Sequence, residues 1–174
     1  MSIDDDARWI TIDGRRWRAS DPSIPSTLRK ELVDELMSAR RAVATQLRSG
    51  DDDALRSARH RVHAAKLALG ERGAPWWEEM GEDDLRRRAE AAIEVLARHR
   101  APGRTICPSD AARVVGGAHW RSQMELVRQV AADMADDERI EILQHGEPVA
   151  GRTWRGPVRI RSRAVEIAAE RGAG

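Results

Sequence analysis

Apolar and polar residues alternate twice near the start of the chain, on either side of an Asp-Gly pair. Residues 9–12 read Trp-Ile-Thr-Ile, residues 15–18 read Arg-Arg-Trp-Arg, and residues 13–14 are Asp-Gly. Asp-Gly tolerates the positive φ angles of a type I′ turn, so this pattern predicts a two-residue β-hairpin whose paired residues share a face. The side chains expected to pack inward are those of Ile10, Ile12 and Trp17. On the opposite face, an arginine over Trp9 forms either a cation–π contact or a base-stacking platform.

Apolar residues spaced four and three apart follow, and they predict a helical hairpin. The stripe of the first helix consists of Leu28, Leu32, Leu36, Ala39, Val43 and Leu47. We expect this helix to end at Gly50 and the acidic residues 51–53 to cap the next one. The stripe of the second helix, which packs on the first as an antiparallel partner, consists of Leu55, Ala58, Val62, Ala65 and Leu69. A basic row is expected on its outer face, either solvated or bound to phosphates: Arg56, Arg59, His60, His63 and Lys66.

Glycine, proline and acidic residues between positions 70 and 84 predict a junction in the chain. The tryptophan pair at 76–77 is expected to seal the helical hairpin or to dock the two halves. Apolar spacing then predicts a helix over residues 85–99. The expected organisation is a β-hairpin and helical-hairpin domain at residues 1–80, a second domain at 84–163 and a tail at 164–174.

The second half has the element order of a winged helix: a helix, a short strand, two more helices and a terminal β-hairpin. After the strand, Ser109 is expected to cap a helix that Gly116-Gly117 ends. Another amphipathic helix is expected to begin near Trp120. Alternation at residues 139–142 and 156–161 predicts two half-buried strands. The expected fold class is mainly α with small β: an N-terminal β-hairpin, an antiparallel helical hairpin and a C-terminal winged-helix domain.

Several short motifs of this half together carry a family resemblance. They are Thr105 to Ser109, Ala112-Arg113, Trp120-Arg121, Val127-Arg128, Arg139 to Glu141 and Gly156 to Arg161. With them the C-terminal half resembles an uncharacterised bacterial family of winged-helix-like domains of unknown function. The resemblance implies a fold and no activity. As a whole, the chain resembles proteins loosely labelled Tol-type biopolymer transporters, and no residue pattern supports transport.

Composition and charge narrow the class of protein. Of the 30 basic residues, only Lys30 and Lys66 are lysines. Arginine suits phosphate and carboxylate recognition, but a GC-rich coding sequence produces the same bias. No apolar run is long enough to span a bilayer, and the acidic residues 4–6 are unlike a signal peptide, so we expect a cytoplasmic protein without a membrane partner. The single cysteine, Cys107, excludes an intramolecular disulfide.

No motif indicates catalysis, a cofactor or a metal. The chain has no phosphate loop, no nucleophile elbow and no zinc-protease motif. His60 and His63 lack an acidic or cysteine ligand on their helix face, and Cys107 is expected to be a small buried apolar residue. We therefore expect a protein that is not an enzyme and that uses neither metal nor cofactor.

The distribution of charge favours a binding surface for anionic partners in the second half of the chain. Residues 84–174 contain 16 basic and 13 acidic side chains, a balance of +3, whereas residues 1–83 contain 14 and 16, a balance of −2. The expected DNA-binding residues are Arg121, Ser122, Arg128 and Gln129 on the recognition helix, with Arg152 and Arg155 in the wing. The leading interpretation is a winged-helix protein that binds double-stranded DNA, such as a transcriptional regulator. Because Glu125 and Glu147 interrupt this surface, the alternative is a protein-interaction or scaffold module without nucleic-acid binding.

Overall fold

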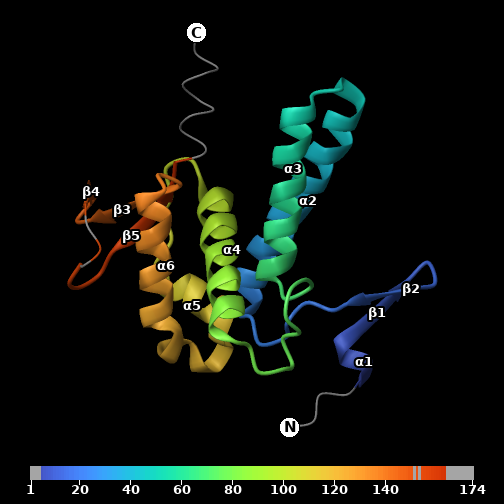
Figure 1. The fold of residues 1–174 in the computed structure, drawn as a ribbon, viewed down its shortest axis with the longest axis horizontal. Helices are drawn as coiled ribbons and strands as arrows, with labels where there is room; N and C mark the ends of the chain where they lie inside the picture. Colours follow the sequence, from blue (N-terminus) through green and yellow to red (C-terminus); the bar gives the residue numbers. More distant parts are fainter. Residues whose placement is uncertain (1–4, 151, 153, 164–174) are drawn as a thin grey trace.

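Helices make up most of the chain, and two small antiparallel sheets accompany them. The computed structural model describes residues 5–150, 152 and 154–163, so the predicted tail at 164–174 lies outside the described residues. The elements in chain order are α1 (Asp5–Arg8), β1 (Trp9–Ile12), β2 (Arg15–Arg18), α2 (Ser26–Ser49), α3 (Asp52–Ala68), α4 (Glu82–Arg100), α5 (Pro108–Gly116), the 3-10 helix η1 (Gly117–Gln123), α6 (Met124–Asp136), β3 (Ile140–Gln144), β4 (Glu147–Pro148) and β5 (Arg159–Ser162). Figure 1 shows α4 between the α2–α3 pair and the α5–α6 side, with the β1–β2 hairpin at one end of the molecule. The predicted mainly helical fold with small antiparallel sheets, an N-terminal β-hairpin, a helical pair and C-terminal strands is confirmed.

The β1–β2 hairpin has the predicted turn and register. Asp13 and Gly14 have φ angles of 50° and 74°, and Ile10 pairs with Trp17 as expected. The prediction that the apolar face packs inward is wrong, since Ile10, Ile12 and Trp17 are 47%, 53% and 43% exposed. The reason is that the hairpin contacts the rest of the protein through its opposite face, which leaves the apolar face beside an open cleft.

The next two helices form the predicted antiparallel pair. α2 ends at Gly50, whose φ angle of 74° strains any residue with a Cβ atom. The Asp51 carboxylate caps α3 by accepting a hydrogen bond from the amide of Ala54 at 2.9 Å. The predicted stripe of α2 is buried at residues 28, 32, 36 and 39, whereas Leu47 is 58% exposed. Figure 1 shows the reason: the tip of the α2–α3 pair extends beyond the neighbouring helix α4.

The strands of the second half form a three-stranded antiparallel sheet. Its strand order is β4-β3-β5, and Ile106 forms a β-bridge with Ile160 on the other side of β5. The β3–β5 pairing agrees with the predicted strand pair. The short strand β4, which follows a tight turn at His145-Gly146, is an addition to that prediction.

The start of α5 differs from the prediction that Ser109 caps it. The N-cap residue is Cys107, and the Asp110 carboxylate accepts a hydrogen bond from the Cys107 amide at 3.0 Å. Pro108 accounts for the difference, because its fixed φ angle and missing amide hydrogen suit the first position of a helix. The helix therefore begins before Ser109, which lies inside its first turn.

The start of α6 also differs from the prediction of a helix from near Trp120. Residues 117–123 form the tighter 3-10 helix η1, and α6 begins at Met124. Gly117 has a φ angle of 50°, so the chain changes direction there before the next helix starts. Arg121 and Ser122 consequently lie on η1 and not on α6.

Buried side chains from both predicted domains form one cluster. Members from successive parts of the chain are Leu32, Leu69, Leu96, Val127 and Ile160. A buried ion pair crosses the same boundary: Arg88 Nη2 of α4 donates to Asp21 Oδ2 at 2.7 Å, and Arg88 Nε donates to the Ala68 carbonyl at 3.3 Å. Packing is thus shared across residues 81–83, and separate folding of the two halves stays a prediction.

Candidate functional site

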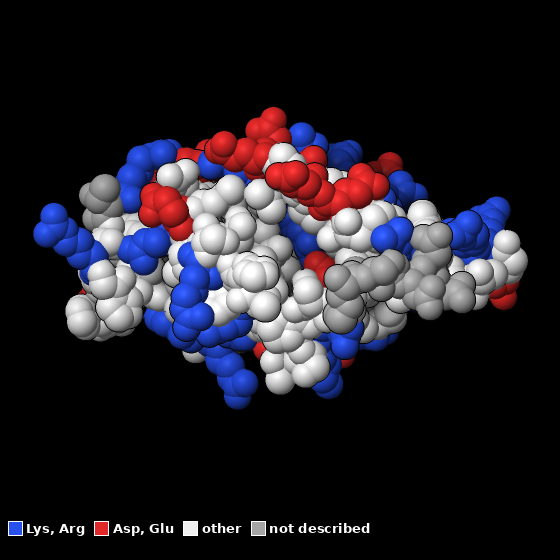
Figure 2. Space-filling view, turned by 90° about the horizontal axis from the view of Figure 1, so that it is seen from below, with Lys and Arg blue, Asp and Glu red and all other residues white. Residues whose placement is uncertain are grey.

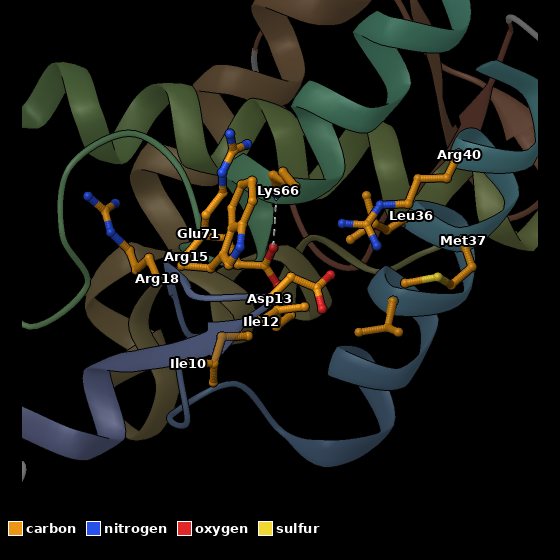
Figure 3. A pocket seen from close by; sticks show the side chains of 12 residues that line it. Ile10, Ile12, Asp13, Arg15, Arg18, Leu36, Met37, Arg40, Lys66 and Glu71 are labelled. Atoms are coloured by element: carbon orange, nitrogen blue, oxygen red, sulfur yellow. Dashed lines mark ion pairs between the residues drawn. The ribbon is translucent and has the colours of Figure 1, made fainter. Parts of the chain in front are cut away.

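A cleft of about 620 Å³ separates the β1–β2 hairpin from α2, and we call it the hairpin cleft. One wall is the apolar face of the hairpin and the other is α2. Its apolar side chains are Ile10, Ile12, Trp17, Val33, Leu36 and Met37. Figure 3 shows the hairpin residues on one side and the labelled residues of α2 on the other, with Lys66 and Glu71 joined by an ion pair.

Aromatic and arginine contacts hold the hairpin on its opposite face. The Trp9 ring meets Trp77 edge-on, with 5.6 Å between the ring centroids. Arg18 Nη1 donates a hydrogen bond to the carbonyl of Gly73 at 2.8 Å. Arg16 lies 4.8 Å from the centroid of the Trp9 ring, the geometry of a cation–π contact. Because these contacts attach the hairpin to the loop after α3, its apolar face does not close onto α2.

The hairpin cleft concentrates the exposed apolar surface of the protein. Four of the five large hydrophobic residues that are exposed in the described part of the chain line it: Ile10, Ile12, Trp17 and Met37. Single exposed apolar residues are ordinary on protein surfaces, whereas a contiguous group of them usually marks a binding surface. This grouping makes the hairpin cleft the candidate functional site.

Basic side chains surround this apolar surface. Lys66 Nζ lies 5.0 Å from the centroid of the Trp17 ring and 3.8 Å from the Glu71 carboxylate. Burial lowers the pKa of Lys66, Glu71 acts in the opposite direction, and Arg40 lowers the pKa further. Arg15 and Arg40 also line the cleft, and neither forms an ion pair with another described residue. The lining also includes Arg18 and the carboxylates of Asp13 and Glu71, so four basic residues face two acidic ones. The balance is positive and suits an anionic group next to an apolar one.

Figure 2 shows how charge is distributed over the face seen from below. Basic side chains lie at the end of the molecule where the β1–β2 hairpin lies and also toward the opposite end and along the lower edge, whereas most acidic side chains follow the upper edge. The net charge of the N-terminal half does not reveal the basic residues around the cleft, because the half also includes the acidic segment at residues 78–83. Local charge near the cleft therefore differs in sign from the average over the half.

The predicted DNA-binding residues lie on three segments of the second half. Arg121 and Ser122 are on η1, Arg128 and Gln129 are on α6, and Arg152 and Arg155 lie between β4 and β5. Arg128 and Arg152 both make contacts within the protein. Arg128 Nη2 donates to the carbonyl of Trp154 at 2.5 Å, and Arg152 donates to Asp133 and Asp136, each at 2.8 Å. These two arginines attach the segment before β5 to α6.

The other predicted DNA-binding residues are exposed. Arg121 lies 4.6 Å from the ring centroid of the preceding tryptophan, and the Ser122 hydroxyl donates to a backbone carbonyl of η1 at 2.8 Å. Gln129 donates to the Glu125 carboxylate at 3.1 Å. Arg155 has no side-chain partner among the described residues. The surface that α6 presents is thus mixed in charge.

Within the described residues there is neither a candidate metal centre nor a membrane-spanning helix. No group of three or more His, Cys, Asp or Glu side chains in this part of the chain could hold a metal ion. His60 Nδ1 lies 3.4 Å from Glu94 Oε1, and His63 Nδ1 lies 2.8 Å from Arg72 Nη1. The same part of the chain has no helix that combines the length and the apolar composition needed to cross a bilayer. Cys107 is only half-buried.

Comparison with known protein families identifies a similarity for the second half of the chain. Residues 86–163 match the model of a family described as "Protein of unknown function (DUF3253)". The match extends from the first turns of α4 to the residue after β5. It confirms the similarity to an uncharacterised family and carries no activity with it. No curated protein matches the chain.

Sequence reasoning missed the α2 wall of the hairpin cleft, although a signal for it exists. Val33, Met37 and Arg40 follow a spacing of four and three along α2, so they form a second stripe beside Leu36 of the core stripe. The expected basic row on α3 also needs correction, because Lys66 is 14% exposed and lies over Trp17 in the cleft. Its long side chain reaches across from α3 toward the hairpin.

Proposed function

We propose that this protein is a non-enzymatic protein-interaction module whose docking site is the hairpin cleft. One observation carries the proposal: Ile10, Ile12, Trp17 and Met37 are exposed and grouped on two facing walls. Covering aliphatic and aromatic side chains contributes roughly 25 cal/mol per Å² of apolar surface. A partner segment with two or three apolar side chains would supply that cover, because pockets of roughly 300–1,000 Å³ accept groups of this size.

We also infer that residues 82–162 form a winged helix. The order of α4, the Ile106 bridge, α5, α6, β3 and β5 supports this assignment, as does the pairing of Ile106 and β3 on opposite sides of β5. Winged helices serve as protein-docking units as well as DNA-binding units, so the fold is compatible with the proposed role.

DNA binding through α6 and the segment after β4 is the second candidate. Arg121 and Arg155, which are exposed and have no ion-pair partner in the described part of the chain, favour it. Two observations weigh against it: the carboxylates of Asp133 and Asp136 neutralise Arg152, and Glu125 lies beside Gln129 on the outer surface of α6. Phosphate recognition needs a continuous basic surface, which α6 does not present.

A peptide selection tests the proposed function. Random 16-residue peptides displayed on phage are panned on the full chain, and the enriched peptides are then measured against the double variant Ile12→Gln, Met37→Gln. Both side chains are already exposed, so the fold should tolerate the changes. If Ile12 and Met37 each lose about half of their apolar contact with the peptide, the binding free energy weakens by about 2 kcal/mol in total. This loss raises Kd about 30-fold.

The matched control for this experiment is Thr11→Gln, which lies on the same strand with its side chain on the other face of the hairpin. Its Kd should stay within about twofold of the unaltered chain. Enriched peptides that bind the double variant as tightly as the unaltered chain would contradict the proposed site. Failure to enrich any peptide, together with tight binding of duplex DNA, would favour the second candidate.

A further inference from the structure

A second hollow lies next to the hairpin cleft on the surface of α2 and α3. It has a volume of about 310 Å³, and its lining consists of Arg40, Val43, Arg59, Val62 and Arg72. We call it the arginine hollow. Arg40 lines both the arginine hollow and the hairpin cleft, so a ligand that leaves the cleft past Arg40 enters the hollow.

The three arginines of this hollow form no ion pair with a carboxylate among the described residues. Arg40 and Arg59 are exposed and form no ion pair with another described residue, and Arg72 contacts the ring of His63 instead of a carboxylate. The neighbouring groups respond to this positive charge. Burial lowers the pKa of His63 and Arg72 lowers it further, while Arg40 and Arg72 both act to lower the pKa of Lys66.

Several arginines elsewhere in the described chain are paired with carboxylates. Examples are Arg61 with Glu35, Arg86 with Asp133, Arg100 with Glu31 and Asp110, and Arg161 with Glu141. No described acidic side chain lines the arginine hollow, and the nearby Glu71 carboxylate is engaged by Lys66 and by the Ser20 hydroxyl. An external anion would neutralise these arginines, and a guanidinium group binds a carboxylate through two parallel hydrogen bonds.

We infer that the partner segment is acidic as well as apolar: its apolar side chains enter the hairpin cleft, and Asp or Glu side chains next to them bind Arg40, Arg59 and Arg72. This inference rests on the proposed function. A peptide combines aliphatic side chains and carboxylates at a spacing of a few residues. A nucleic acid supplies phosphates but no aliphatic groups for a cleft walled by isoleucine, leucine and methionine. Charge complementarity therefore favours a peptide segment.

The peptides enriched on the full chain provide the probe. They should contain apolar residues followed or preceded by Asp or Glu, and their Kd should rise at least tenfold between about 50 and 500 mM salt, because salt screens exposed charges. In the double variant Arg59→Glu, Arg72→Glu, the Kd of an acidic peptide should rise at least tenfold. A peptide whose Asp and Glu residues are replaced by Lys should bind this variant more tightly than it binds the unaltered chain.

The control is the double variant Arg41→Glu, Arg48→Glu. It makes the same charge change at two exposed arginines of α2 that line neither the hairpin cleft nor the arginine hollow. It should change Kd less than threefold at about 150 mM salt, where the Debye length is about 8 Å. The charge-swapped peptide tests direct pairing, because a general loss of stability would not produce a gain in affinity.

The outcomes separate the two proposals. Peptides that depend on Ile12 and Met37 but show no acidic enrichment and no salt dependence would overturn the inference and leave the docking site intact. Peptides that bind without any contribution from the hairpin cleft would overturn both. Binding of phosphatidylserine vesicles or duplex DNA that requires Arg59 and Arg72, with no enriched acidic peptide, would assign the arginine hollow to a different anion and overturn the inference.

Discussion

Removal of the Arg88 side chain should be among the most destabilising single changes in this protein. The side chains of Arg88 and Asp21 are only 3% and 5% exposed. In the variant Arg88→Met, Asp21 Oδ2 loses its partner at 2.7 Å and the Ala68 carbonyl loses a donor at 3.3 Å. The Asp21 carboxylate would stay buried, accepting only the hydrogen bond that the Ser23 amide donates to Oδ1 at 2.8 Å.

The expected loss follows from that unpaired charge. Breaking a buried ion pair by removing one partner costs about 3–5 kcal/mol. For a chain of about 150–250 residues, each kcal/mol lowers the melting temperature by about 2–4 °C, so Tm should fall by roughly 6–20 °C. The double variant Asp21→Asn, Arg88→Met should recover part of this loss, because asparagine leaves no buried charge and keeps an oxygen for the Ser23 amide.

Urea unfolding followed by tryptophan fluorescence measures the effect as a shift of midpoint at constant slope. Arg87→Met is the matched control, since the neighbouring Arg87 side chain is 66% exposed and its loss should change the free energy of unfolding by less than about 0.5 kcal/mol. A loss below about 1 kcal/mol for Arg88→Met, or a double variant less stable than Arg88→Met, would refute the reasoning.

Three further predictions concern the halves, the DNA candidate and pH. A chain beginning at Gly81 should stay soluble and unfold cooperatively in calorimetry. Its Tm should be lower than that of the full chain, because α4 loses its packing on α2 and α3. A broad transition would mean that the two halves depend on one shared core. If duplex DNA binds, Arg121→Glu with Arg155→Glu should weaken it at least tenfold in fluorescence anisotropy and leave Tm unchanged, whereas an unaltered affinity would exclude these residues. Burial, reinforced by Arg72, lowers the pKa of His63 in the folded protein. Below about pH 6.5 the unfolded chain therefore binds more protons than the folded one, so acidification should lower the free energy of unfolding. His63→Gln should make the difference between the free energies of unfolding at about pH 7.5 and 5.5, measured with urea, smaller than in the unaltered chain; an equal difference would contradict this role of His63.

Local chemistry made much of the fold predictable. Asp13-Gly14 determines the hairpin turn, and the three-and-four spacing of leucines and alanines determines the helical pair that ends at Gly50. These signals act over a few residues and depend little on the rest of the chain. The start of α6 was less predictable, because a 3-10 helix and an α-helix differ only in the hydrogen-bond spacing of successive turns, and the apolar pattern around Trp120 and Met124 is compatible with both.

The candidate site was hidden because it depends on contacts between distant segments. Alternation in the hairpin indicates an apolar face, and it does not indicate whether that face meets the core or a cleft. The orientation of the hairpin is determined by the ring contact between Trp9 and Trp77 and by the hydrogen bond from Arg18 to the carbonyl of Gly73. Both contacts join residues more than fifty positions apart in the sequence. The arginines that line the cleft and the hollow belong to the half with the negative overall balance, so a count of charges by half could not indicate them.

The central claim is that partners dock in the hairpin cleft, and the side-chain indole signals of the tryptophans test it most directly. In a ¹⁵N-labelled sample each tryptophan contributes one indole N–H signal, and Trp17 lines the cleft, whereas Trp120 and Trp154 lie in the second half. On titration with an enriched peptide, the Trp17 signal should shift in proportion to occupancy while those of Trp120 and Trp154 stay in place. Shifts at Trp120 or Trp154 with an unmoved Trp17 signal would contradict the account.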